Sequence, residues 1–402
     1  MGVRTDAVAW LEMDSGIQTG DRAHARVGGA GVPWYLWVGV AAVTSSTVGG
    51  QWDLAWHRSI GRDSFWTPAH VAVYACGVMA AIVCLWLAFV CTTGRSNVGS
   101  IKVLGLRAPL GVFIVGWGGV AMLTSAPFDN WWHNAYGVDV KVISPPHMVL
   151  LVGMRAVTVG TLVLILAAMN RARNGGELEQ VRRLRWMYLY MGGLAVGDQM
   201  FFLEGYTLDT SLHRMTAYAA MAVALPVFFA LLQRTSGVKW AATISAAIYT
   251  AFLMGEILIF PLFPAQPRLG PVWFPVTHLM PAKFPILIIA PAVALDVLWQ
   301  RANAWKPWKI AALAGVLFVC VLVAVEWPFA SFLMTKASEN RFFGTMYFGF
   351  YSRPDGFNRM RMFIPPPHGV VIAVEMMVAA ICAAVSYWVG ERVGMWMREV
   401  RR

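Results

Sequence analysis

Two stretches of the chain contain the same combination of residue types that commonly bind metal ions. The stretches read WDLAWHRSIGRDSFWTPAH and FDNWWHNAYGVDVKVISPPH, and their candidate ligands are Asp53, His57 and His70 in the first and Asp129, His133 and His147 in the second. In each stretch a carboxylate and a histidine lie four positions apart, which places both on one face of a helix. Two imidazoles and one carboxylate leave coordination positions open, so both sets are candidate catalytic and metal-binding residues.

The order of these ligands predicts two helical hairpins. The aspartate and the first histidine belong to the end of one helix, and a proline-containing turn places the second histidine in the first turn of the next helix. The two turns also share a glycine and an aspartate, which are Gly61 and Asp63 in the first and Gly137 and Asp139 in the second. We interpret Asp63 and Asp139 as helix caps or, together with Arg62, as residues that contact the ligands and hold an imidazole in one tautomer.

The composition is that of an integral membrane protein. Hydrophobic residues make up 58% of the 402 residues and charged residues only 13%, which excludes a soluble globular protein. A membrane span needs roughly 20 apolar residues, and about ten segments meet that requirement. We therefore expect an all-α polytopic protein with about ten transmembrane helices in repeated helical hairpins. The segments centre near Ala41, Ala81, Gly118, Val157, Gly193, Val223, Ser245, Ile288, Phe318 and Ala379.

The net charge of +11 is concentrated in alternate loops. The positive-inside rule accounts for this pattern, so no nucleic-acid partner is expected. The pattern predicts cytoplasmic termini and places both Asp/His/His sets near the outer, periplasmic face of a bacterial inner (cytoplasmic) membrane. The basic residues of these loops are Arg4, Arg22, Arg26, Arg95, Lys102, Arg107, Arg171, Arg173, Arg182, Arg183, Arg185, Arg234, Lys239, Arg301, Lys306, Lys309, Arg392, Arg398, Arg401 and Arg402.

Three regions are expected along the chain. Residues 1–31 form a flexible cytoplasmic tail, and residues 32–170 form a four-helix module that contains both metal-ligand sets. Residues 171–402 form six further helices with extended outer loops at 264–277 and 331–367.

Three carboxylates in the apolar segments of the last region are candidates for a proton path. They are Glu256, Glu326 and Glu375. Ionisable residues at membrane depth usually face a protein interior or a water-filled cavity, which gives such residues a functional interpretation.

The segment DLAWHRSIGRDSFWTPAHV resembles the C subunit of the copper membrane monooxygenases, the particulate methane and ammonia monooxygenases. The family motif is an aspartate, a histidine four positions later, an Arg-Asp pair and a Thr-Pro-x-His. The matching residues are Asp53, His57, Arg62, Asp63, Thr67, Pro68 and His70. The family also has a second site, made of an asparagine, a histidine four positions later and another fourteen positions after that. Its counterparts here are Asp129, His133 and His147.

The resemblance covers about residues 33–170 and implies copper at both sites, with dioxygen activation at one or both. Asp129 stands where the family has asparagine, which adds a negative charge. About six further spans find no counterpart in that subunit, and the chain has no cupredoxin-like segment. We therefore expect a divergent, longer relative.

The expected function is that of a copper-dependent membrane monooxygenase, or its metal-bearing subunit, that oxidises a small or lipophilic substrate. Such a protein needs an electron donor, which the sequence does not identify, and we expect protein partners or a second copy of the chain in addition to membrane lipids. The ligand types alone suit iron and zinc as well as copper. The alternatives are a protein for metal-ion transport or handling, with the three glutamates as its inward path, and a non-catalytic membrane subunit of a larger complex.

Overall fold

The computed structural model of the chain describes residues 31–61, 64–96, 98–137, 144–207, 213–266, 277–281, 285–302, 304–333, 335, 337 and 369–401. Helices dominate these residues. In chain order they are α1 (Trp34–Ser59), α2 (Pro68–Thr92), α3 (Leu110–Tyr136), α4 (Pro145–Asn174), α5 (Leu178–Thr207), α6 (Met215–Ala224), α7 (Pro226–Ser236), α8 (Ala241–Ile259), the 3₁₀ turn η2 (Phe260–Leu262), α9 (Ile289–Arg301), α10 (Pro307–Leu333) and α13 (Val370–Arg398).

Seven of the described helical segments are long and apolar enough to cross a membrane, so the chain is a helical integral membrane protein. They are Pro68–Thr92, Leu110–Tyr136, Pro145–Asn174, Met215–Ser236, Ala241–Leu262, Pro307–Phe332 and Val370–Arg398. Helices α1 and α5 have 26 and 30 residues, which is enough for a span. Both are more polar, because α1 contains Gln51 and Asp53 and α5 contains Asp198.

The eighth expected span differs from the structure. Its predicted centre, Ile288, is the N-cap of α9, which has only 13 residues. Pro285 precedes this helix, and a proline disfavours helical geometry in the residue before it. The carboxylate of Glu326 on α10 accepts a hydrogen bond from the backbone N–H of Leu287 (2.8 Å). The apolar run around Ile288 is therefore partly an ordered, non-helical segment.

A short antiparallel ribbon connects α2 to α3, and the sequence pattern missed it. Its strands are β1 (Ile101–Val103) and β2 (Leu106–Ala108). The two residues between them, Leu104 and Gly105, have φ angles of 48° and 87°. A two-residue hairpin turn with positive φ at both positions favours glycine. Gly105 was therefore the residue in the sequence that could have indicated this turn.

Glycines bring α3 and α4 into close antiparallel contact. Gly111 lies opposite Gly160, and Gly118 lies opposite Gly153. A Cβ atom added to Gly118 would lie 2.7 Å from the carbonyl oxygen of Gly153, and one added to Gly160 would lie 2.7 Å from that of Gly111. Small residues allow such close approach between membrane helices. The same register brings the end of α3 to the beginning of α4.

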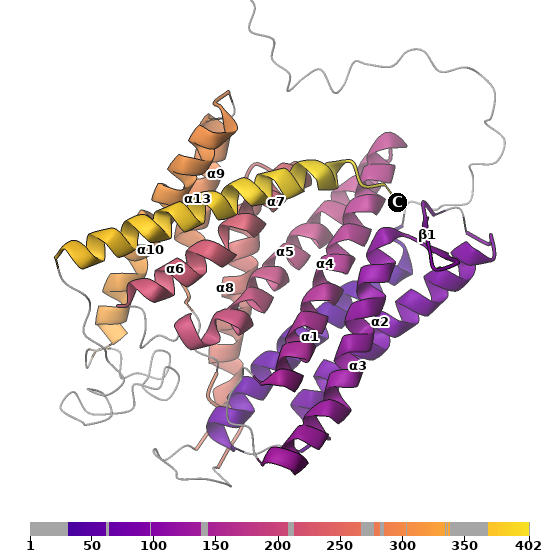
Figure 1. Cartoon of the computed structure of the whole chain (residues 1–402), viewed down its shortest axis with the longest axis horizontal. Helices are drawn as coiled ribbons and strands as arrows, with labels where there is room; N and C mark the ends of the chain where they lie inside the picture. Colours follow the sequence, from indigo (N-terminus) through magenta and orange to yellow (C-terminus); the bar gives the residue numbers. More distant parts are fainter. Residues whose placement is uncertain are drawn as a thin grey trace, which may run out of the picture. The chain divides into compact units, whose positions relative to one another are not determined.

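Helices α1 and α2 form the other hairpin in a similar way. A Cβ atom added to Gly49 would lie 2.9 Å from the backbone nitrogen of Val73, and the hydroxyl of Ser45 donates a hydrogen bond to the carbonyl oxygen of Ala72 (2.7 Å). Helix α2 also packs against α3, and α1 packs against α4 and α5 (Figure 1). Both hairpins contact α5, the first through α1 and the second through α4.

Helix α13 lies against α6, α7 and α10 (Figure 1). The hydroxyl of Ser386 accepts a hydrogen bond from the N–H of Val227 (3.0 Å) and donates one to the carbonyl of Val223 (2.7 Å). These two backbone groups would bond to each other in an unbroken helix. The serine therefore satisfies them at the break between α6 and α7, where Pro226 follows.

A second buried carboxylate has a structural role in this region. Asp296 on α9 accepts hydrogen bonds from the backbone N–H groups of Ala242 and Thr243, the hydroxyl of Thr243 and the side-chain amide of Gln233. The backbone donors belong to the first turn of α8, whose N–H groups have no partner within the helix. Asp296 therefore caps α8 and attaches it to α9.

Candidate metal centres

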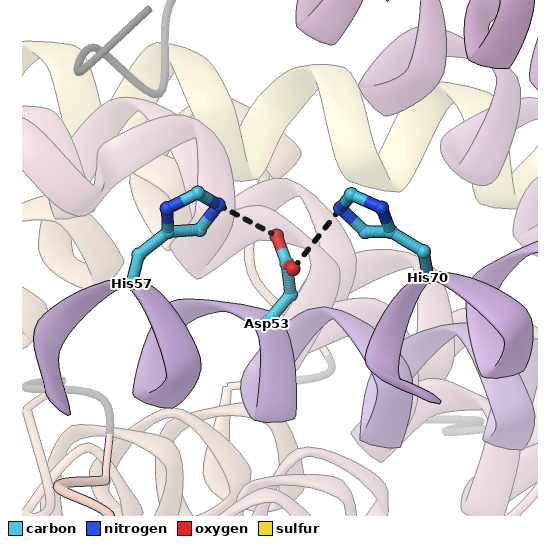
Figure 2. Close-up of side chains that lie close together, drawn as sticks. All are labelled: Asp53, His57 and His70. Atoms are coloured by element: carbon cyan, nitrogen blue, oxygen red, sulfur yellow. Dashed lines mark ion pairs between the residues drawn. The ribbon is translucent and has the colours of Figure 1, made fainter. Parts of the chain in front are cut away.

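The first Asp/His/His set comes together between α1 and α2. Asp53 and His57 lie in the last two turns of α1, and His70 lies in the first turn of α2. Figure 2 shows the carboxylate between the two imidazoles, with each ring directing a nitrogen at it. Nε2 of His57 lies 3.7 Å from one carboxylate oxygen and Nε2 of His70 lies 3.2 Å from the other. We call this set site 1.

The second set has the same arrangement between α3 and α4, and we call it site 2. Asp129 and His133 lie near the end of α3, and His147 lies in the first turn of α4. Each histidine Nε2 lies 3.4 Å from a different oxygen of the Asp129 carboxylate. The structure therefore brings all six predicted ligands together in two groups of three.

The ligand spacing in both sites suits a metal ion. Within each site, three ligand atoms lie within 4.8 Å of one another. Metal bonds of about 2.0–2.2 Å place neighbouring nitrogen and oxygen ligands about 2.8–3.6 Å apart, and the measured distances of 3.2–3.7 Å are close to that range. Both groups therefore could hold a metal ion, although the ligand types do not identify which one.

A local hydrogen-bond chain fixes the orientation of His70. The Nδ1 of His70 lies 3.0 Å from the carbonyl oxygen of Ser64. A carbonyl oxygen can only accept a hydrogen bond, so Nδ1 carries the proton. Nε2 of the neutral ring then has a lone pair and no proton. The hydroxyl of Thr67 donates to the same Ser64 carbonyl and accepts from the Ser64 N–H, each at 2.8 Å. The turn before α2 is thus built to direct Nε2 of His70 at Asp53.

This tautomer has a direct consequence for site 1. The neutral His70 directs a lone pair at a carboxylate oxygen of Asp53 only 3.2 Å away. That oxygen, Oδ1, is buried and accepts no hydrogen bond from the described residues. Two lone pairs at this distance repel each other unless a cation lies between them, and both a proton and a metal ion would satisfy that requirement. The residues present therefore fit a bound metal ion.

Site 2 orients its ligands through different backbone groups. The Nδ1 of His133 lies 3.4 Å from the carbonyl oxygen of Gly137, and the Gly137 N–H donates to the carbonyl of His133 (3.0 Å). Gly137 has a φ angle of 87°, a conformation that favours glycine. Ser144 caps α4 by accepting from the N–H of His147 (3.4 Å). Oδ1 of Asp129 is also buried and accepts no hydrogen bond from the described residues.

Both sites are partly open to the surroundings. The ligand side chains of site 1 are 17–38% exposed and those of site 2 are 20–25% exposed. Exposed tryptophans lie beside them in the sequence, with Trp66 in the turn of site 1 and Trp131 on α3. Tryptophan is enriched at the interface of a membrane with water, which is consistent with sites near the end of the membrane-spanning helices.

Site 1 is also attached to the second half of the chain. The hydroxyl of Ser59, at the end of α1, accepts a hydrogen bond from the N–H of Met280 (2.7 Å), and the guanidinium of Arg58 donates to the carbonyl of Pro281 (3.4 Å). The segment before Met280 pairs with the residues after η2, where Leu279 donates to Phe263 (3.1 Å). This closes the base of the predicted outer loop 264–277, most of which lies outside the described residues.

The remaining predicted residues have different outcomes. Glu256 on α8 and Glu326 on α10 are buried, whereas Glu375 on α13 is half-buried. The proposed supporting residues Arg62, Asp63 and Asp139 lie outside the described residues, as does the loop 331–367 apart from its first few positions. Among the described residues, Ser64 and Thr67 support His70. The Ser-x-x-Thr-Pro spacing before a helix was the signal for this turn.

No protein-family model, curated protein or solved structure matches this chain.

Proposed function

We propose that this protein is a metal-dependent oxidoreductase of the membrane, either a copper monooxygenase or its metal-bearing subunit. The observation that carries the proposal is the pair of open, three-ligand Asp/His/His groups at the ends of two helical hairpins. A redox-active copper or iron ion in such a site supplies one-electron chemistry and reaction with dioxygen. The resemblance of residues 33–170 to the copper membrane monooxygenases supports copper as the metal.

The protein's own residues contribute charge, orientation and access. Asp53 and Asp129 each give one negative charge to a site with two neutral imidazoles, which offsets part of the charge of a divalent ion in a poorly solvated place. The Ser64 carbonyl holds His70 in the tautomer that binds through Nε2. Exposed aromatic side chains such as Trp66 and Trp131 offer a lipophilic substrate an apolar approach from the membrane.

The test begins with the metal content of the purified protein in lipid nanodiscs. We expect two copper ions per chain in the wild type, one in His70→Ala, one in His147→Ala and none in the double variant. His278→Ala is the matched control, because His278 contacts Thr277 in a loop outside both sites, and it should keep two ions.

Oxygenase activity is then tested separately from metal binding. The copper-loaded protein, given a chemical reductant and a panel of small alkanes, alkenes and lipids, should incorporate ¹⁸O from ¹⁸O₂ into product, and the double variant should not. Absence of any stoichiometric metal ion in the wild type contradicts the proposal as a whole. Binding of redox-inert zinc alone would agree with the proposed metal sites but would contradict the oxygenase activity.

A further inference from the structure

A small cavity with four polar side chains in its lining lies on the side of α1 that faces α5 and α8, away from the metal ligands. It is lined by Thr47, Gln51, Gly193, Leu194, Gly197, Tyr249, Phe252, Leu253 and Glu256. Thr47 and Gln51 are four residues apart on α1 and share one face of the helix. About 10 Å³ of the cavity is open to the centre of a water molecule, which is about the room that a single water needs.

Two of the residues that line this cavity each have a buried oxygen atom without a hydrogen-bond partner among the described residues. These atoms are Oε1 of Gln51 and Oε2 of Glu256, and the two residues are only 3% and 8% exposed. An unsatisfied buried polar atom carries a substantial free-energy cost. One water in the cavity would satisfy both atoms by donating a hydrogen to Oε1 of Gln51 and accepting one from Oε2 of a protonated Glu256.

A third carboxylate lies behind the same cavity wall. Asp198 on α5 is buried and accepts hydrogen bonds from the hydroxyls of Thr47 (3.4 Å) and Thr158. Thr47 therefore contacts the cavity on one side and Asp198 on the other. Its hydroxyl can accept a proton from a cavity water while donating its own proton to the carboxylate.

The charged surroundings of the two carboxylates differ. Glu256 forms no ion pair with the described residues. The titratable group beside it is Tyr249, which also interacts electrostatically with Glu326. The Tyr249 hydroxyl donates to the Pro285 carbonyl (2.9 Å). An ionised carboxylate without a cation is costly in such a place, which favours a protonated Glu256. Asp198 is also buried, but the positive charge of Arg155 acts on it and the hydroxyls of Thr47 and Thr158 donate to it, which offsets part of the cost of burying its ionised form.

We propose that Glu256, one cavity water and Thr47 form a proton relay to Asp198 in the membrane interior. The carboxylic acid of Glu256 gives its proton to the water, the water gives a proton to Oγ1 of Thr47, and the Thr47 hydroxyl gives its own proton to Asp198. The water and the threonine each gain one proton and lose one. The net change is one proton moved from Glu256 to Asp198. Gln51 orients the water by accepting its second hydrogen bond.

Among the described residues that line the cavity, Thr47 is the one side chain that can pass a proton on from the water. Gly193, Leu194, Gly197, Phe252 and Leu253 have no side-chain proton carrier. Tyr249 already donates its hydroxyl proton to a backbone carbonyl, and a neutral amide such as that of Gln51 does not carry protons readily. The relay is independent of the metal sites and can be tested without a bound metal.

The experiment measures hydrogen–deuterium exchange of the Glu256 carboxylic acid by infrared spectroscopy of the full-length protein in lipid nanodiscs. The carbonyl band of the protonated group is assigned by its loss in Glu256→Gln. In Thr47→Val, which keeps the shape but removes the hydroxyl, we expect exchange at this band to slow at least tenfold. Thr47→Ser restores the hydroxyl and should exchange at the wild-type rate.

A second variant removes the water and leaves every relay side chain in place. A Cβ atom added to Gly197 would lie 3.7 Å from Cγ2 of Thr47 and 3.9 Å from Cδ2 of Tyr249, which are ordinary contacts. Alanine therefore fits the helix and occupies the cavity, so Gly197→Ala should slow exchange at the Glu256 band as Thr47→Val does. Glu326→Gln, at a buried carboxylate outside the cavity, should leave the rate unchanged.

Two results would overturn the relay. The first is the absence of a protonated-carboxyl band that disappears in Glu256→Gln. The second is wild-type exchange in Gly197→Ala, which would show that protons reach Glu256 without the cavity water. The Gly197→Ala result decides the question even where Thr47→Val fails to fold.

Discussion

The two metal-ligand sites use the same three residue types in the same order, yet the supporting contacts differ among the residues that the structure describes. Site 1 holds His70 through the Ser64 carbonyl, which the Thr67 hydroxyl holds in turn. Site 2 positions His133 through the carbonyl of Gly137 at the end of α3, over a longer distance of 3.4 Å. Among the described residues, the support therefore acts on the second histidine in site 1 and on the first histidine in site 2.

The surroundings of the two sites also differ. Helix α1 of site 1 packs against α4 and α5 as well as α2, and its last residues bond to Met280 and Pro281. Helix α3 of site 2 packs against α2 and α4, and glycines bring it into backbone contact with α4. Site 1 is thus bonded directly to the segment around Met280, whereas site 2 is joined to the second half of the chain through α4, which packs against α5.

The largest expected effect comes from removing the carboxylate charge in either site. In Asp53→Asn and in Asp129→Asn we expect metal affinity at the altered site to fall by more than about 100-fold, since even supporting residues are worth about 10–100-fold. Each carboxylate oxygen faces a different imidazole, so an amide would direct its NH₂ group, which cannot bind a metal ion, at one of the two Nε2 atoms. Copper titration in His147→Ala and His70→Ala backgrounds reports on site 1 and site 2 separately.

This substitution pair also tests whether the sites are equivalent. Equal losses are expected because the ligand geometry is the same in both. If Asp129→Asn retained its metal while Asp53→Asn lost it, then site 2 would behave as the asparagine site of the copper monooxygenases does, and the geometric equivalence would be wrong.

A smaller effect, confined to site 1, is expected from the residue that supports His70. Thr67→Val removes the hydroxyl that holds the Ser64 carbonyl, so the imidazole loses its fixed orientation. We expect metal affinity at site 1 to fall by about 10–100-fold, with site 2 unchanged and Thr67→Ser close to the wild type. The titration is done in the His147→Ala background, with the thermal unfolding midpoint as the check on folding.

The corresponding substitution in site 2 should not behave in this way. Ser144 caps the helix through the N–H of His147 and does not contact an imidazole nitrogen in the described hydrogen bonds. Ser144→Ala should therefore cost about 1 kcal/mol of stability as a lost cap and change metal affinity at site 2 much less. A loss equal to that of Thr67→Val would contradict the difference we draw between the sites.

The smallest effect on metal affinity is expected from the helix contact beneath site 2. In Gly118→Ala the added methyl group would meet the Gly153 carbonyl at 2.7 Å, and a backbone atom cannot move aside as a side-chain end can. We expect a loss of about 1–3 kcal/mol in stability and a severalfold weaker site 2, with site 1 retained. Metal titration in the His70→Ala background and thermal unfolding measure the two quantities.

Gly255→Ala is the matched control for this substitution. Gly255 is also inside a helix, but a Cβ atom added there would have no atom within 4 Å. Alanine should therefore be neutral or stabilise the protein by up to about 1 kcal/mol. Destabilisation by Gly255→Ala of the same size as by Gly118→Ala would show that the effect does not come from the contact between α3 and α4.

Much of the architecture could be predicted because it depends on local sequence. Apolar runs of sufficient length predicted helices at nine of the ten expected centres, and the Asp-x-x-x-His spacing predicted ligands on one helix face. The prediction failed at Ile288, where Pro285 and the hydrogen bond from Leu287 to Glu326 replace helical geometry. Hydropathy alone could not detect this, because a buried non-helical segment is as apolar as a helix.

The sequence by itself determined which residue types are present to bind a metal and which segments are helical, because helix periodicity and hydropathy act over a few neighbouring residues. Only the tertiary structure decided that Ser64 and Thr67 orient His70, that glycines of α3 and α4 meet in register, and that Gln51 and Glu256 share a water-sized cavity. These features depend on contacts between residues brought together by packing. The approach of two helices is set by the side chains of both, which no local pattern in either one contains.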